Sequence, residues 1–162
     1  MPVNVSDLAT QKALNDRQAF GLTLYGEARG EPQTGRVAVA GVIQNRLADG
    51  RWGTNFRSVC LWPWQFSCWK PEGGSANYAV VMAMARALLE GGEDLVLPAA
   101  LKSCLAIADQ ALAGTLADTT NGATHYLTEL LYASHPPSWA VVMEQTARIG
   151  GHLFLRDRAQ AA

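Results

Sequence analysis

The sequence predicts an α+β domain that is mainly helical and closes with a small C-terminal β-hairpin element. Up to Gly114, and apart from residues 51–74, apolar residues recur at helical spacing and are bounded by capping residues, glycines and prolines. After Asp118 the pattern changes to short strand-like segments around a glycine pair. The chain has 162 residues, of which 49% are hydrophobic and 17% charged. This is enough apolar surface for one domain that needs neither a metal nor disulfides for stability.

The first predicted helix begins at Ser6 and ends around Arg29 or Gly30, because Pro32 disfavours helical geometry at the residue before it. A second helix is predicted over residues 35–48. Its apolar start alone would also fit a strand, but its length, its polar continuation and the turn signal that follows favour a buried helix.

Residues 51–74 predict a long aromatic loop, because they lack a hydrophobic period and contain prolines and a glycine pair. A third helix is predicted from Ser75, which can cap its first turn, to the glycine pair at 91–92. A fourth helix is predicted from Pro98, a residue favoured in the first turn, to Gly114.

The last part of the chain predicts a small β element. A short strand is expected over residues 124–127, and a hairpin over residues 146–149 and 152–156 with Gly150-Gly151 as its two-residue turn. We expect residues 157–162 to form a flexible tail.

Charge and composition argue against several classes of protein. Thirteen basic and fourteen acidic residues give a net charge of −1 without a basic run, so we expect no nucleic-acid partner. No window approaches the roughly 20 apolar residues that span a bilayer, so we expect no membrane anchor. The first 24 residues lack the pattern of a signal peptide, so we expect synthesis in the cytoplasm without an export signal.

The cysteines do not predict a metal site. Cys60, Cys68 and Cys104 form no CxxC pair and have no neighbouring histidine pair, so we expect no metal and no cofactor. Whether Cys60 and Cys68 form a disulfide stays open, because sequence spacing does not show whether their side chains meet.

Two carboxylates stand out near the end of the first predicted helix. Glu27 and Glu31 are four residues apart, so they would share one helix face. The negative end of the helix dipole and partial burial beside Leu24 and Ala28 both favour the protonated form of Glu27. A protonated carboxyl is what protonation of a glycosidic oxygen requires, so Glu27 is a candidate general acid. The alternative, two solvated surface carboxylates, is the more common situation for a glutamate on a helix.

Four of the five tryptophans fall between positions 52 and 69. Exposed aromatic rings stack on sugar rings, so this loop, including Trp64, is a candidate for binding a glycan. The alternative is that the rings cover a core that lacks regular structure. A lone histidine such as His125 is more often structural than catalytic. Polar groups that could line the same groove are Gln65, Ser67, Thr124, His125 and Tyr126.

Seven blocks in collinear order carry a resemblance to a known family. They are YGEARGEP at 25–32, GRVAVA at 35–40, NR at 45–46, QFSC at 65–68, GATHY at 122–126, PSW at 137–139 and RIGGHLF at 148–154. From about Gln18 to Arg156 the chain resembles the SleB-type cell wall hydrolases, the spore cortex-lytic enzyme family. It departs from the family after the His-Tyr pair, where Leu127-Thr128-Glu129 replaces an aromatic-Asn-Pro segment, which predicts a different local groove wall.

The resemblance implies a single domain that is lysozyme-like, or lytic-transglycosylase-like, and acts on the glycan strands of peptidoglycan. Residues 18–156 would form the catalytic domain behind a helical extension of residues 1–17. Glu27, the first glutamate of the GEARGE block, would be the catalytic acid/base. The expected substrate-binding residues are Glu31, Trp64, Gln65, Ser67, Thr124, His125 and Tyr126.

The expected reaction uses one carboxylate. Glu31 is the evident local candidate for a second one, but on the same helix face it would flank the acid rather than oppose it across a sugar. We therefore expect a lytic transglycosylase that cleaves the β-1,4 bond between N-acetylmuramic acid and N-acetylglucosamine and leaves 1,6-anhydromuramoyl ends. The alternatives are a hydrolytic muramidase with the same acid and a non-catalytic glycan-binding module. An amidase or peptidase has less support, because no zinc site or activated cysteine or serine is evident.

An enzyme made without an export signal needs another route to the cell wall. We therefore expect a phage endolysin that is released through a holin and acts as a monomer.

Overall fold

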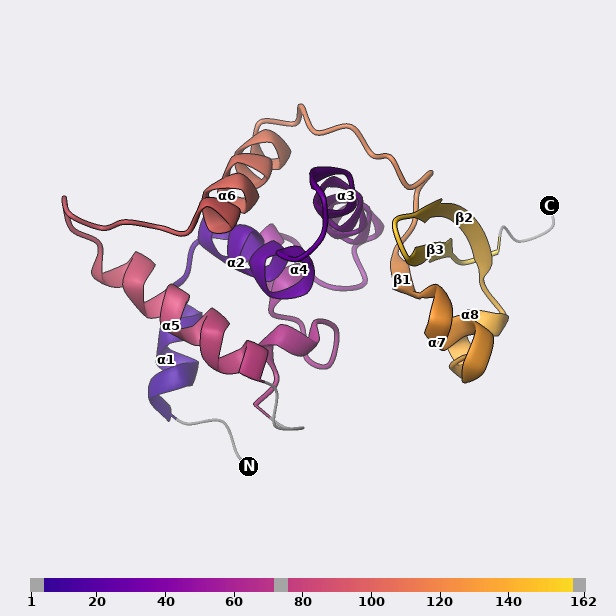
Figure 1. Ribbon diagram of the computed structural model, residues 1–162, viewed down its shortest axis with the longest axis horizontal. Coiled ribbons are helices and arrows are strands. Elements are labelled where there is room, and N and C mark those ends of the chain that lie inside the picture. The colour runs from indigo at the N-terminus through magenta and orange to yellow at the C-terminus, as the bar shows by residue number, and fades with distance from the viewer. Residues whose placement is uncertain (1–4, 72–75, 159–162) are drawn as a thin grey trace.

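The computed structural model describes residues 5–71 and 76–158, and there the chain folds into a helical body joined to a small sheet (Figure 1). The elements of the helical body are α1 (Val5–Ala13), α2 (Asp16–Ala28), α3 (Gln33–Asp49), α4 (Phe56–Cys60), the 3₁₀ helix η1 (Ser67–Trp69), α5 (Ala76–Glu90) and α6 (Ala99–Leu112). The remaining elements are β1 (His125–Thr128), α7 (Glu129–Ser134), α8 (Ser138–Val141), β2 (Glu144–Ile149) and β3 (His152–Arg156). The predicted fold class, mainly helical with a small C-terminal β element, is confirmed.

The core of the helical body is built around α2, which contacts α3, α4, α5 and α6. Its residues 19–25 are all buried, as expected for a helix that is surrounded by others. Phe20 is fully buried and meets the ring of Phe56 on α4 edge to face at 5.1 Å between centroids. The position of α2 fixes where the residues at its carboxyl end lie.

The prediction of one continuous helix from Ser6 to about Gly30 is wrong, because the chain forms two helices, α1 and α2, separated by Leu14 and Asn15. Asn15 accepts a hydrogen bond from the backbone N–H of Gln18, and the Gln18 side chain accepts one from the Asn15 N–H. This capping box starts a new helix and turns the chain. As a result α1 packs against α5, where Tyr78 donates a hydrogen bond to Asp7.

The segment predicted as an aromatic loop contains α4 and η1, so that prediction is wrong in part. Asn55 and Ser58 form a second capping box, which allows a helix too short to show a hydrophobic period. Two of the indoles, Trp52 and Trp69, join the core, and Trp69 donates a hydrogen bond to Thr23. The other two in this segment remain exposed.

The third and fourth predicted helices are confirmed as α5 and α6. Pro98 occupies the N-cap of α6, one residue before the predicted position. Ser75, the predicted cap of α5, lies outside the described residues. The short helices α7 and α8 were not predicted; Thr128 caps α7 by accepting a hydrogen bond from the Leu131 N–H.

The sheet has the order β1-β3-β2 and all its pairs are antiparallel. The predicted hairpin is confirmed, with β2 and β3 joined at Gly150-Gly151. In β1, Tyr126 pairs with Phe154 of β3, and the two rings stack at 5.8 Å. Of the predicted tail, Asp157 forms a salt bridge with Arg51, and residues 159–162 lie outside the described part.

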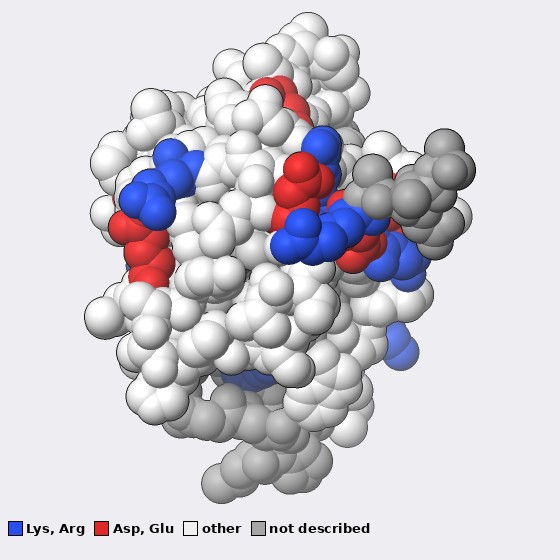
Figure 2. Space-filling view, turned by 90° about the vertical axis from the view of Figure 1, so that its right-hand side faces the viewer, with Lys and Arg blue, Asp and Glu red and all other residues white. Residues whose placement is uncertain are grey.

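Most charged groups on the face that carries the sheet lie next to groups of opposite sign (Figure 2). Pairs of this kind are Arg156 with Glu144 and Arg148 with Glu129. Within residues 5–71 and 76–158, none of the helices has the length and hydropathy needed to cross a membrane. Cys60, Cys68 and Cys104 are buried free thiols.

We expect the substitution Phe20→Ala to lower the free energy of unfolding by about 3–5 kcal/mol, because it removes a fully buried ring at the centre of the helical body. Urea denaturation followed by circular dichroism measures this value. Val96→Ala is the control, since the Val96 side chain is 85% exposed. Equal unfolding midpoints for the two variants would contradict the central role of α2.

Candidate active site

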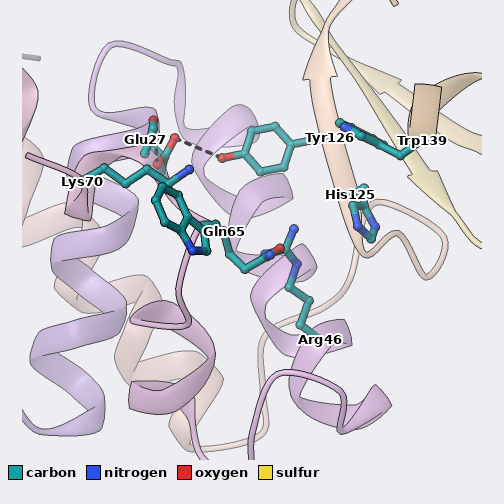
Figure 3. A pocket seen from close by; sticks show the side chains of 9 residues that line it. Glu27, Arg46, Gln65, Lys70, His125, Tyr126 and Trp139 are labelled. Carbon is teal, nitrogen blue, oxygen red and sulfur yellow. Dashed lines mark hydrogen bonds between the residues drawn. The ribbon is translucent and has the colours of Figure 1, made fainter. Parts of the chain in front are cut away.

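Glu27 lies one residue before the end of α2, and donors from two other parts of the chain meet its carboxylate. One oxygen, Oε1, accepts a hydrogen bond from the backbone N–H of Cys68 at 3.2 Å and from the Ser67 hydroxyl at 3.5 Å. The other, Oε2, accepts one from the Tyr126 hydroxyl at 3.3 Å (Figure 3). The carboxylate is therefore held between α2, η1 and β1.

Gly26 makes this arrangement possible, because α2 and η1 approach closely at this residue. A Cβ atom at Gly26 would lie 2.4 Å from Cβ and 2.8 Å from Sγ of Cys68, and 2.9 Å from Cγ2 of Val81. These distances are too short for any side chain to be accommodated without movement. The missing Cβ lets the Cys68 N–H reach Glu27.

The two neutral groups beside Glu27 stay neutral. Burial, and secondly the nearby Glu27 charge, raise the pKa of Tyr126 well above its usual range. Burial and Glu27 also raise the pKa of the Cys68 thiol. Tyr126 is therefore a hydroxyl donor, and Cys68 lacks the thiolate character of a nucleophile.

Arg46 is a buried cation next to the site. Its guanidinium lies over the rings of Trp52 and Phe66, at 5.0 and 4.9 Å from their centroids, and Nε donates a hydrogen bond to the Thr124 carbonyl at 2.7 Å. Burial lowers the pKa of Arg46, but a guanidinium keeps its charge in proteins. The Nη1 atom is buried and finds no hydrogen-bond partner within the described residues.

His125 contacts the rings of Trp52 and Trp139, at centroid distances of 5.8 and 5.3 Å. Its Nδ1 is 2.9 Å from Oγ1 of Thr124. Burial, followed by the charge of Arg46, lowers the pKa of His125 to about 4. The imidazole is therefore neutral at pH 7.

Glu27, Arg46, His125 and Tyr126 are among the nine described residues that line a cavity of about 520 Å³, which we call the Glu27 cavity. Six of the eight residues singled out from the sequence line it: Glu27, Trp64, Gln65, Ser67, His125 and Tyr126. They come from α2, from the segment between α4 and α5, and from β1. Three lining residues were not singled out: Arg46, Lys70 and Trp139. Arg46 and Trp139 fall in the NR and PSW blocks, which is the signal that could have found them.

Glu31 and Thr124 do not line the Glu27 cavity. The expectation that Glu31 shares a helix face with Glu27 is wrong, because α2 ends at Ala28. Glu31 lies in the turn that follows, with Oε1 at 3.7 Å from Nδ1 of His152. Thr124 is buried and supports its neighbours instead, through its hydroxyl to His125 and its carbonyl to Arg46.

Glu27 is the one carboxylate among the described residues that line the cavity. Three donors around an acid, one of them a neutral phenol, together with a buried cation nearby, can support transfer of a proton from the carboxyl and then stabilise the resulting carboxylate. No group of three or more His, Cys, Asp or Glu residues positioned to hold a metal ion occurs within residues 5–71 and 76–158.

Residues 30–155 match the family model described as Cell Wall Hydrolase. The chain belongs to the cell wall hydrolase family. The match begins three residues after Glu27, so it does not include this glutamate. The predicted resemblance to SleB-type proteins is confirmed at the level of the family.

Curated and solved relatives agree with this family membership. The chain is 32% identical over 140 residues to a spore cortex-lytic enzyme of Halalkalibacterium halodurans, covering 86% of this chain and 34% of that protein. It spans about a third or less of the curated relatives it matches. The catalytic domain of the germination-specific lytic transglycosylase SleB from Bacillus anthracis superposes with a TM-score of 0.57 at 26% identity, covering 89% of this chain and 96% of that one. The catalytic domain of the Bacillus cereus SleB protein gives 0.55 at 26% identity, covering 87% and 89%.

We expect Gly26→Ala to destabilise the fold by about 1–3 kcal/mol, the usual cost of an inserted group in a packed interior. The added Cβ would push η1 away from α2. Thermal or urea denaturation measures the loss, and Cys68→Gly in the same chain should restore part of it by removing the nearest atoms. Full stability of Gly26→Ala alone would contradict the close approach described above.

The low pKa of His125 predicts a pH dependence of stability. Its folded-state pKa of about 4 lies below the unfolded value of about 6.5, so protons bind the unfolded state first as the pH falls. The wild type should therefore lose stability relative to His125→Gln between pH 6.5 and pH 4, and no further below pH 4. Urea denaturation of both proteins across this range measures the difference. Parallel pH profiles would show that His125 titrates normally.

Proposed function

We propose that this chain is a peptidoglycan-degrading enzyme that cleaves the β-1,4 bond between N-acetylmuramic acid and N-acetylglucosamine, with Glu27 as the general acid and base. The observation that carries the proposal is the carboxylate of Glu27 with its three donors, the one carboxylate among the described residues that line the Glu27 cavity. Membership of the cell wall hydrolase family supports peptidoglycan as the substrate. The printed name of the SleB relative, a lytic transglycosylase, supports the type of reaction.

In the first step Glu27 gives its proton to the bridging oxygen of the glycosidic bond, and the bond between that oxygen and C1 of the muramoyl residue breaks. The carboxylate left behind accepts the hydrogen bonds of Tyr126, Cys68 and Ser67, which stabilise its charge as the oxocarbenium-like centre develops. The neutral state of Tyr126 is required here, because a phenolate would have no hydrogen to donate.

In the second step the Glu27 carboxylate takes the proton of the muramoyl C6 hydroxyl, and the C6 oxygen forms a bond to C1. The product has a 1,6-anhydromuramoyl end, and Glu27 is again protonated. Enzymes that use two carboxylates place them about 5 to 9 Å apart across the scissile bond. Glu31 faces His152 outside the cavity lining, which favours the route with one carboxylate.

The competing chemistries are less well supported by the site. Burial raises the pKa of the Cys68 thiol, so the cysteine nearest to Glu27 is a poor nucleophile for a peptidase. A purely glycan-binding module would not require a carboxyl with three donors in its cavity. Release from a phage-infected cell remains a prediction, whereas the relatives' names refer to spore cortex and germination.

We expect Glu27→Gln to lower the rate of peptidoglycan cleavage by about 10²–10⁴-fold, the usual contribution of a general acid or base. Clearing of purified peptidoglycan is followed by turbidity, and mass spectrometry of the soluble products should show anhydromuramoyl ends that are lighter by one water than reducing ends. Glu144→Gln is the matched control, because Glu144 pairs with Arg156 on the sheet.

Each other outcome identifies a different error. Full activity of Glu27→Gln would reject this residue as the acid. Reducing muramic ends would show hydrolysis in place of transglycosylation. Binding of peptidoglycan without cleavage by the wild type would indicate a glycan-binding module.

A further inference from the structure

Two more hollows adjoin the Glu27 cavity through shared residues. The first, of about 300 Å³, shares Trp64 and Lys70 with the cavity. The second, also about 300 Å³, shares Trp62, Leu8 and Gln11 with the first hollow. Together they form a row that leads from Glu27 toward α1, and we call the two hollows the indole trough. Each is at the small end of the usual range for ligand sites.

The two indoles of the trough are held outward. The Trp64 side chain is 71% exposed, and its backbone φ of 69° lies in the left-handed region that bulky residues rarely adopt. Such backbone persists only where the surrounding structure fixes it, and it is concentrated at ligand sites. Lys70 Nζ lies 5.3 Å from the centre of the Trp64 ring. The first wall of the trough is therefore an exposed indole with a cation beside it.

Trp62 is 41% exposed and forms the boundary between the two hollows. Trp62 lies near Gly53, which has a φ of 113°. A Cβ at Gly53 would lie only 2.1 Å from Oγ of Ser58, so both the backbone conformation and the available space require glycine. A Cβ there would lie 3.6 Å from Cζ3 of Trp62. Trp52 and Trp69, by contrast, are buried in the core. Of the four indoles in this segment, two are therefore part of the core and two face solvent.

Among the described residues that line the row, four are basic and one is acidic. Lys12 and Arg57 line the far hollow, Lys70 lies at the join, and Arg46 lines the Glu27 cavity. None of these four forms a salt bridge with an acid in the described ranges, 5–71 and 76–158. Glu27 is the one acid among the described lining residues. A ligand that carries carboxylates along its length complements this pattern.

We propose that the indole trough binds further sugars of the glycan strand that is cleaved at Glu27. The apolar sugar faces stack on Trp64 and Trp62, and the basic groups face carboxylates of the strand. The inference rests on the proposed function, because it takes its occupant from the continuity with the Glu27 cavity. Helix α1, which supplies Leu8, Gln11 and Lys12, precedes residue 30, the first residue of the family match.

The test measures binding in a Glu27→Gln background, so that strands stay intact. Isothermal titration calorimetry is carried out with peptidoglycan glycan strands of two, four and eight sugars. Affinity should rise with length, and Trp62→Ala should weaken the octamer about tenfold while leaving the disaccharide unchanged. Trp62→Tyr should retain most of the affinity, because a tyrosine ring can still stack. Leu130→Ala, an exposed apolar residue of α7 outside the three hollows, is the control.

The source of the carboxylates is tested with Lys12→Glu, a change at an exposed position that leaves the core intact. Binding of this variant and of the protein with Lys12 is compared for three ligands: strands with stem peptides, strands freed of peptides, and neutral chitin oligomers. Weaker binding of only the peptide-bearing strands would assign the basic groups to stem peptides. Weaker binding of only the peptide-free strands would assign them to the lactyl carboxylate, which is free only where the stem peptide has been removed. Weaker binding of both kinds of strand would assign them to carboxylates of either source. If Lys12→Glu leaves the affinity for each of the three ligands unchanged, the charge argument is overturned.

The failure of this inference differs from failure of the proposed function. An unchanged dependence of affinity on length in folded Trp62→Ala would overturn the trough while leaving the role of Glu27 intact. Absence of strand cleavage by the wild type, with length-dependent binding retained, would overturn the reaction while leaving the trough.

Discussion

The carboxylate of Glu27 is where three separately folded parts of the chain meet. Helix α2 carries it, the Cys68 N–H and Ser67 hydroxyl of η1 approach one oxygen, and the Tyr126 hydroxyl of β1 approaches the other. A half-buried carboxylate needs hydrogen-bond donors, and in this fold they come from residues 40, 41 and 99 positions further along the chain. The same contacts therefore serve two purposes: they connect the helical body to the sheet, and they determine the chemistry of the site.

Two packing features keep those contacts in place. The absence of a side chain at Gly26 lets η1 lie against α2, and stacking of Tyr126 on Phe154 sets the direction of the phenol. Arg46, which also lines the cavity, is held in place by the Thr124 carbonyl and by the rings of Trp52 and Phe66. Because these supports are buried and closely packed, the donors are oriented before any substrate binds, which is the condition for effective electrostatic stabilisation.

The aromatic segment serves both stability and surface recognition. Trp52 and Trp69 complete the core, whereas Trp62 and Trp64 face outward beside basic groups. The hydrophobic effect alone would bury all four rings. Two of them remain exposed because short capped elements, α4 and η1, together with positive φ values at Gly53 and Trp64, fix the path of the backbone. The exposed Trp64 lines both the trough and the Glu27 cavity, so the trough adjoins the acid.

Local patterns in the amino-acid sequence were sufficient to predict the long helices α3, α5 and α6, the β2–β3 hairpin and the family, because periodicity, glycine stops and ordered motif blocks can be read without knowing the packing. They also singled out six of the nine residues that line the Glu27 cavity. The packed fold was needed to show that the helix breaks at Asn15, that Glu31 turns toward His152, and that Arg46, Lys70 and Trp139 line the cavity. Capping boxes compete with a continuous helix on small energy differences, and which side chains converge depends on packing between distant segments.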